Sequence, residues 1–116
     1  NYAKLTSHEW AAGGICSEVG MGNATLESCV NMGEVSSTNI AGGIVGVADI
    51  YNLTFSLSRC RHEGQVNSTD IAGGVCGLVK KTDGILSMDS NTNSGTVNGV
   101  AGSETNIIGK DERISL

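Results

Sequence analysis

Four sets of residues recur 31 positions apart in three successive units, and this period restricts the chain to a repetitive fold. Alternating with them is a second repeated element, an Ala-Gly-Gly triplet followed by apolar residues, which begins at Ala12, Ala41 and Ala72. Units of this length stack so that each contacts only its neighbours, which makes a solenoid. The sets are Leu26/Leu57/Met88, Cys29/Cys60/Asn91, Gly33/Gly64/Gly95 and Val35/Val66/Val97.

Each unit contains three short apolar segments, which in the second unit are residues 40–48, the pair Phe55 and Leu57, and the Gly-x-Val segment at Val66. Short segments rich in β-branched residues and bounded by Gly, Asn and Ser are typical of strands. A helix is disfavoured because paired glycines lie within the most apolar segment. The sequence therefore predicts an all-β parallel β-helix of about three and a half coils, each of roughly 30 residues with three short strands.

We expect residues 1–116 to form a single domain, with coils at about 11–39, 40–70 and 71–106 and a partial coil at 107–116. The net charge of −5 and the scattered basic residues do not fit a nucleic-acid surface, which needs clustered Lys and Arg. No apolar run approaches the roughly 18 residues that span a membrane. Because the sequence begins at Asn1 without Met, we expect a processed form or an excerpt.

Residues 28–35 (SCVNMGEV) and 40–46 (IAGGIVG) resemble the GLUG-type repeat, whose pattern is approximately N-C-Y-N-T-G-x-V, a spacer and G-G-I-V-G. The resemblance extends from about residue 11 to residue 109. It implies a right-handed β-helix in a secreted or surface protein of bacteria, such as an adhesin-like protein or the non-catalytic part of an immunoglobulin A peptidase. The sequence departs from the pattern at Asn91, where Cys is expected, and at Val30, Arg61 and Thr92, where Tyr is usual.

The cysteines suggest one candidate disulfide. Cys29 and Cys60 occupy equivalent positions in adjacent coils, so their Cα atoms should lie about 4.8 Å apart, within the range that a disulfide accepts. Stacked side chains point in parallel directions, which makes the bridge awkward, and a ladder of buried thiols is the alternative. Cys16 and Cys76 are two coils apart, too far for a direct bridge.

No metal, cofactor or catalytic site is expected. A zinc site drawn from Cys29, Cys60, His62 and Cys76 is disfavoured because strand alternation sends neighbouring side chains to different places and no Cys-x₂-Cys motif occurs. Nucleophilic catalysis needs an orienting His, and the chain has only His8 and His62. A body about 17 Å tall is too short for an extended substrate groove. We therefore expect that the chain is not an enzyme.

Three Asn-x-Ser/Thr sequons are candidate glycosylation sites, at Asn23, Asn52 and Asn67. Asn52 and Asn67 lie in predicted turns, where a glycan would not disturb stacked strands. Such sequons matter only if the source organism glycosylates its secreted proteins.

The Ala-Gly-Gly strand is apolar on both sides, and such strands are usually buried on both sides. If Ile44 points into the coil, the alternate residues point outward and form a small, flat, apolar strip. We expect this strip to pack against another subunit or domain. Its members are Ala41, Gly43, Val45, Val47, Ala72, Gly74, Cys76 and Leu78.

Open coil ends expose unpaired strand edges, which solenoids normally cap. The sequence therefore predicts either self-association, head-to-tail or lateral, or neighbouring repeats in a larger chain. The function that fits best is a structural extracellular or cell-surface module, either a stalk or adhesin segment or a fibre-forming subunit. The alternative is a module that binds glycan or host protein, and the third reading is the non-catalytic part of a secreted hydrolase.

Overall fold

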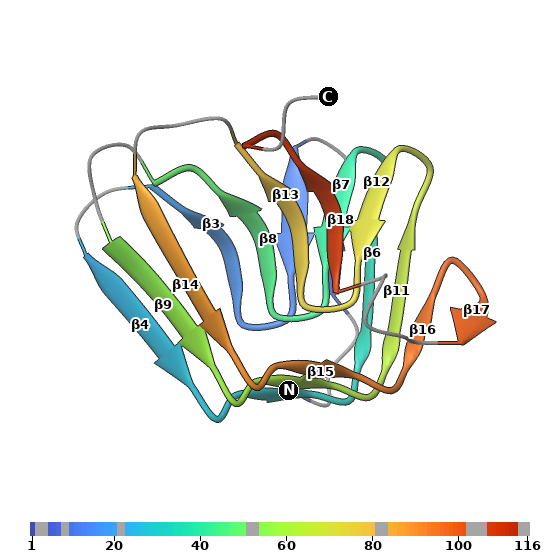
Figure 1. Ribbon diagram of the computed structural model, residues 1–116. Coiled ribbons are helices and arrows are strands. Elements are labelled where there is room, and N and C mark those ends of the chain that lie inside the picture. Colours follow the sequence, from blue (N-terminus) through green and yellow to red (C-terminus); the bar gives the residue numbers. More distant parts are fainter. Residues whose placement is uncertain are drawn as a thin grey trace.

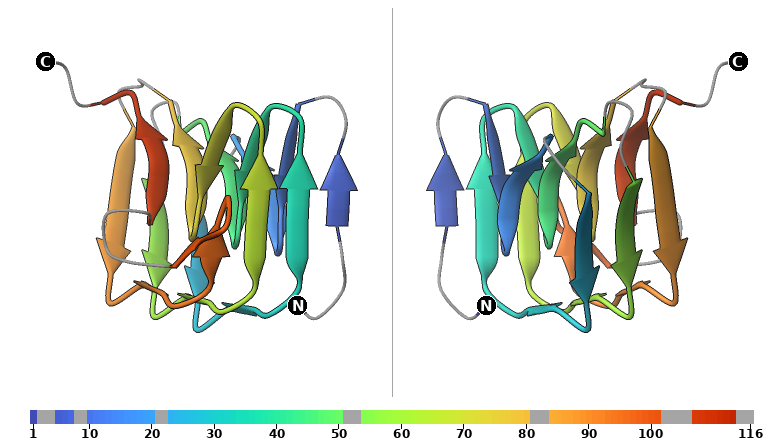
Figure 2. Two further views of the ribbon diagram at one scale, coloured as in Figure 1. Left: turned by 90° about the vertical axis from the view of Figure 1, so that its right-hand side faces the viewer. Right: turned by 90° about the vertical axis from the view of Figure 1, so that its left-hand side faces the viewer.

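The chain forms a parallel β-helix, which confirms the predicted fold class (Figures 1 and 2). A computed structural model describes residues 1, 5–7, 10–20, 23–50, 54–80, 84–101 and 107–113. All regular secondary structure in these residues is strand. Equivalent strands of successive coils pair in parallel, with 29 to 32 residues between partners: Cys16 pairs with Val45, and Cys76 pairs with Ile108.

The strands form five stacked sheets, which we name A to E. Sheet A contains β1 (Leu5–Ser7), β6 (Glu34–Ser37), β11 (Gln65–Ser68), β16 (Thr96–Val97) and β17 (Val100–Ala101). Sheet B contains β2 (Ala11–Gly13), β7 (Ile40–Gly42) and β12 (Ile71–Gly73), and sheet C contains β3 (Cys16–Val19), β8 (Val45–Ala48), β13 (Cys76–Val79) and β18 (Ile108–Asp111). Sheet D contains β4 (Ala24–Glu27), β9 (Thr54–Ser58) and β14 (Ile85–Asp89), and sheet E contains β5 (Val30–Asn31), β10 (Arg61–His62) and β15 (Thr92–Asn93).

The apolar segment predicted as one strand over residues 40–48 is divided by a tight turn. β7 ends at Gly42 and β8 begins at Val45, and the chain reverses between them, so that sheets B and C lie side by side (Figure 1). The reversal requires glycine: a Cβ on Gly42 would overlap the carbonyl oxygen of Val45 and lie 2.6 Å from the amide nitrogen of Gly77. The paired glycines therefore fold the segment back on itself.

This reversal gives each coil three apolar layers. The main core lies between sheets C and D and includes Ile44, Val45 and Phe55. A smaller cluster between sheets A and B joins Val35 and Val66 to the alanines of the Ala-Gly-Gly element. The third cluster, Ile40, Val47 and Leu78, lies between sheets B and C. Sheets B and C thus cover each other within one chain.

The predicted exposed strip is wrong for this reason. Val45 and Cys76 lie in the main core, whereas Val47 and Leu78 face sheet B of the same chain. A strand apolar on both faces is indeed buried on both faces, but this chain itself supplies both covers. All eight predicted interface residues are buried except Ala72, which is half-buried: Ala41, Gly43, Val45, Val47, Ala72, Gly74, Cys76 and Leu78.

Two strands near the C-terminus, β17 and β18, pair with the edges of sheets A and C, which the sequence analysis predicted to be unpaired. β17 turns back and pairs antiparallel with β16, through Asn98 at φ 49° and Gly99 at φ 78°. These angles suit the two-residue hairpin turn for which Asn-Gly is the strongest short signal. β18 continues sheet C beyond β13. At the other end β2, β3 and β4 are the edge strands of sheets B, C and D in the described part of the chain.

Candidate functional site

A buried polar column runs through the coils along sheet E. We use column for a set of residues at equivalent positions of successive coils, and rung for each position in it. Asn31, His62 and Asn93 occupy equivalent positions in β5, β10 and β15 and are all buried. Each lies against a glycine of the B–C turn; a Cβ on Gly43, for example, would come within 2.6 Å of Nδ1 of His62. The column therefore supports the turn that separates sheets B and C.

Hydrogen bonds link successive residues of the column at its N-terminal end. Nδ2 of Asn1 donates to Oδ1 of Asn31 at 3.0 Å, which places Asn1 one rung before Asn31. Asn31 also bonds both the amide nitrogen and the carbonyl oxygen of Gly33, at 3.2 and 3.3 Å. Nδ1 of His62 lies 3.3 Å from Nδ2 of Asn31, and Nε2 lies 3.3 Å from the carbonyl oxygen of Thr96. This arrangement fits a neutral imidazole that accepts at Nδ1 and donates from Nε2.

Burial lowers the pKa of His62 from 6.5, and the carbonyl of Thr96 opposes this shift only in part. The single N–H of the neutral ring is directed to Thr96, so His62 has no proton left for the next rung. Both amide atoms of Asn93, the acceptor Oδ1 and the donor Nδ2, are buried without a hydrogen-bond partner in the described part of the chain. The hydrogen-bonding groups of the column are thus paired at Asn31 and His62 and unpaired at its last rung, Asn93.

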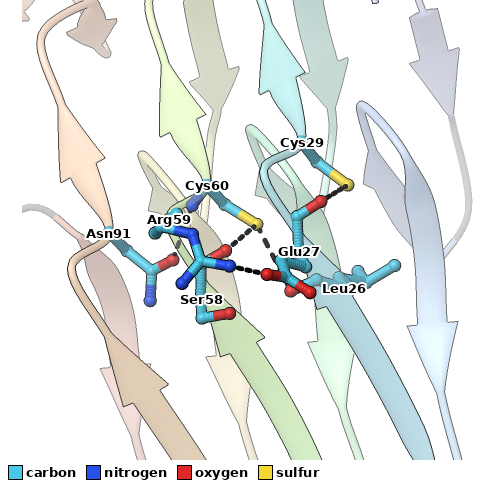
Figure 3. A network of polar contacts seen from close by, with 7 residues as sticks. All are labelled: Leu26, Glu27, Cys29, Ser58, Arg59, Cys60 and Asn91. Carbon is cyan, nitrogen blue, oxygen red and sulfur yellow. Dashed lines mark hydrogen bonds and ion pairs between the residues drawn. The ribbon is translucent and has the colours of Figure 1, made fainter.

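The predicted cysteine column lies at the corner between sheets D and E, where Ser28, Arg59 and Ser90 adopt left-handed backbone angles. Cys29 and Cys60 are both free thiols, and their side chains run parallel to one another (Figure 3). The thiol of Cys60 lies 3.6 Å from the carbonyl oxygen of Leu26 and 3.4 Å from that of Ser58. Burial raises the pKa of the Cys60 thiol.

Asn91 occupies the next rung of the cysteine column, and its hydrogen bonds indicate the role of this position in the fold. Its Oδ1 accepts from the amide of Cys60 at 3.0 Å (Figure 3). Its Nδ2 donates to the carbonyl of Leu57 at 2.7 Å. The thiol of Cys60 makes the equivalent contact to Leu26, one coil earlier. The column therefore bonds each corner to the preceding coil, a role that needs no disulfide.

We predict that Cys60→Asn changes the free energy of unfolding by less than about 1 kcal/mol, because an amide at this rung can repeat the bonds of Asn91. Cys60→Ala should cost about 1–3 kcal/mol more, because it leaves the Leu26 carbonyl without its donor and opens a small cavity. Denaturant unfolding of the purified variants measures both. Equal losses of about 2–4 kcal/mol, with a wild-type mass that rises on reduction, would instead indicate a Cys29–Cys60 disulfide.

The remaining predicted positions do not form a site. Asn23 is exposed, and its Oδ1 accepts from the amide of Thr54 at 2.9 Å. Asn67 lies in strand β11 and is half-buried, so its placement in a turn was wrong; Asn52 and His8 lie outside the described residues. No group of three or more His, Cys, Asp or Glu side chains in the described ranges is placed to hold a metal ion. Those ranges also contain no helix that could span a membrane.

A shallow hollow of about 290 Å³ lies against sheet A, lined only by hydroxyl and amide side chains. Several of these groups bond to the chain itself: Oγ of Ser68 donates to the Asn39 carbonyl at 2.7 Å, and Oγ1 of Thr69 to the Thr38 carbonyl at 2.6 Å. Much of its hydrogen-bonding capacity therefore serves the stacking of coils. Its lining is Ser7, Ser36, Ser37, Thr38, Asn67, Ser68, Thr69 and Asn98.

The N-terminal end of the solenoid exposes apolar residues whose equivalents in later coils are buried. Ile15 is 42% exposed in the first coil, whereas Ile44 and Val75, at equivalent positions in the next two coils, are 0% exposed. The exposed residues Trp10 and Met32 also belong to the first coil. An open hollow bordered by Cys16, Glu18, Val19, Gly20 and Ala24 lies at the same end. The first coil thus presents the uncovered end of the main core.

Comparison with known proteins adds no relative. No family model, no curated protein and no solved structure matches the chain. The fold defines the class, a parallel β-helical solenoid, and the resemblance to the GLUG-type repeat stays a prediction.

Proposed function

We propose that the chain is a structural β-helical module of an extracellular or cell-surface protein, acting as a stalk or adhesin segment or as the subunit of a fibre. The observation that carries this proposal is the exposure of Ile15 beside its buried equivalents Ile44 and Val75. One further coil would bury this residue and pair the edges of β2, β3 and β4. The extracellular location rests on the resemblance of residues 28–46 to the GLUG-type repeat.

The buried polar column supports a mechanical role. Buried polar groups that are satisfied only in one register fix how coils stack, in the manner of the Asn ladders of cross-β assemblies. Asn31 and His62 hold this register inside the chain. The upper rung, Asn93, has buried amide atoms that the described residues leave unpaired.

Association of the purified chain tests the proposal. We expect sedimentation velocity to show a weight-average mass that rises with protein concentration, and negative-stain images to show rods longer than the 33 Å long axis of one chain. Open strand edges and uncovered core at the same end drive this association. A monodisperse monomer at every concentration would overturn the fibre subunit and leave at most a segment within a longer chain.

A further inference from the structure

Sheet C ends in opposite charges on the same column. Glu18 in β3 pairs with Val47 in β8, which pairs with Leu78 in β13, which in turn pairs with Lys110 in β18. The two middle residues are buried, whereas Glu18 and Lys110 are exposed. The apolar column therefore carries a carboxylate at its first rung and an ammonium group at its last.

The neighbouring column of the same sheet ends in apolar residues. Cys16 and Ile108 are half-buried, and the rungs between them, Val45 and Cys76, are buried. Ile15 and Ile107 precede these end rungs, and the amide of Val75 donates to the carbonyl of Ile107 at 2.9 Å. The two ends of sheet C thus match in apolar character and oppose each other in charge.

We propose that copies of this chain associate head-to-tail by pairing β18 of one copy with β3 of the next, in the register that sheet C already uses. This inference rests on the proposed function and names the surface and the partner, a second copy. In this register Ile108 meets the second copy's Cys16, and Lys110 meets its Glu18. Complementary charges at a strand edge favour this register and disfavour the alternatives.

Lys110 is the cation of β18 that is accessible to an incoming strand, because the charges next to it are paired with one another or only weakly with Lys110. Asp111 is bonded to Arg113, whose Nη2 lies 2.6 Å from Oδ2, and this contact lowers the pKa of Asp111. Lys110 lies 4.0 Å from Glu112, and its side chain is 59% exposed. Such a long, solvated contact is weak, so Lys110 can turn to a carboxylate on an incoming strand.

The same stacking continues the polar column. Asn1 lies one rung before Asn31, and Asn31 belongs to the same coil as β3. When β3 of the incoming copy follows β18, the incoming Asn1 lies one rung above Asn93. The incoming Asn1 therefore lies next to the buried amide of Asn93, which has no partner in the described residues. Two columns of different chemistry therefore select one register.

Sheet A sets a condition on this assembly. β17 of the first copy and β1 of the incoming copy would occupy the same rung of sheet A. β17 is held by a two-residue pairing with β16, so it is the strand that we expect to leave its place. Separation of β17 from β16 is then a step that precedes association and slows head-to-tail growth.

Charge reversal at each end tests the register. Glu18→Lys alone places two ammonium groups in contact, and Lys110→Glu alone places two carboxylates in contact, so each should weaken association at least about tenfold. An equimolar mixture of the two variants should recover association as alternating copies, because every contact then joins unlike charges. Sedimentation velocity on each sample measures these changes, and Glu63→Lys, at an exposed position of the middle coil, is the matched control.

The outcomes separate this inference from the proposed function. Wild-type association that neither reversal changes, or variants that fail to recover on mixing, would overturn the β18–β3 pairing and leave the structural module standing. A wild-type chain that stays monomeric would overturn self-association itself. Because Glu18 and Lys110 are exposed, we expect unchanged melting temperatures, and circular dichroism of each variant checks that it is folded.

Discussion

Gly42→Ala is expected to destabilise the chain by about 3 kcal/mol or more. The new methyl group would overlap the carbonyl oxygen of Val45 and lie 2.6 Å from the amide nitrogen of Gly77. Both obstacles are backbone atoms of paired strands, so neither can move without breaking sheet C. Thermal or denaturant unfolding followed by circular dichroism measures the loss.

Gly20→Ala is the matched control for this substitution. A Cβ on Gly20 would meet its nearest atoms at 3.7 Å, an ordinary contact distance. We expect Gly20→Ala to leave stability unchanged or to raise it by up to about 1 kcal/mol, because alanine restricts the unfolded chain. If both variants unfold at the same denaturant concentration as the wild type, sheets B and C do not pack as closely as the structure shows.

Acidification is expected to destabilise the wild-type chain through His62 more than it destabilises a His62→Asn variant. His62 is buried and neutral, and burial lowers its pKa below the unfolded value of 6.5. Its contribution is therefore fully present above pH 6.5 and is lost as the pH falls from 6.5 toward the lowered pKa of the folded chain. Within that window the free energy of unfolding falls by up to about 1.4 kcal/mol per pH unit.

Asn is a suitable replacement because Asn31 and Asn93 occupy the adjacent rungs. An amide at position 62 cannot titrate, and it can also offer a partner to the unpaired amide of Asn93. Urea unfolding at several pH values between 7.5 and 5 gives the difference between the two proteins. His8 is common to both and cancels in that difference. Parallel stability curves would contradict a buried neutral His62.

Much of the architecture was predictable because sheets D and E keep one spacing between successive coils. The 31-residue spacing from Leu26 to Leu57 to Met88 appears unchanged as the register of sheet D. The pairing of Gln65 with Glu34 and Thr96 follows the same interval. The sequence-based reading also placed Cys29 and Cys60 on one column, and both are free thiols in the structure.

The candidate site was predicted less well. The apolar strip failed because alternation shows which residues share a face and does not show what covers that face. The polar column of Asn31, His62 and Asn93 was missed, although its 31-residue spacing and its amide chemistry were visible in the sequence. The β17 hairpin was also missed, and the Asn98-Gly99 pair was its signal.

By itself, the sequence determined the repeat, the strand-rich class and the register of sheets D and E, because the equal 31-residue spacing in these sheets leaves stacked coils only one way to align. Only the tertiary structure decided where each coil reverses. A straight strand and a strand folded at Gly42 and Gly43 have the same pattern of apolar residues, and only the approach of Gly42 to the Val45 carbonyl distinguishes them. That reversal buries both faces of the Ala-Gly-Gly element within one chain, so neither face of this element is left for a partner.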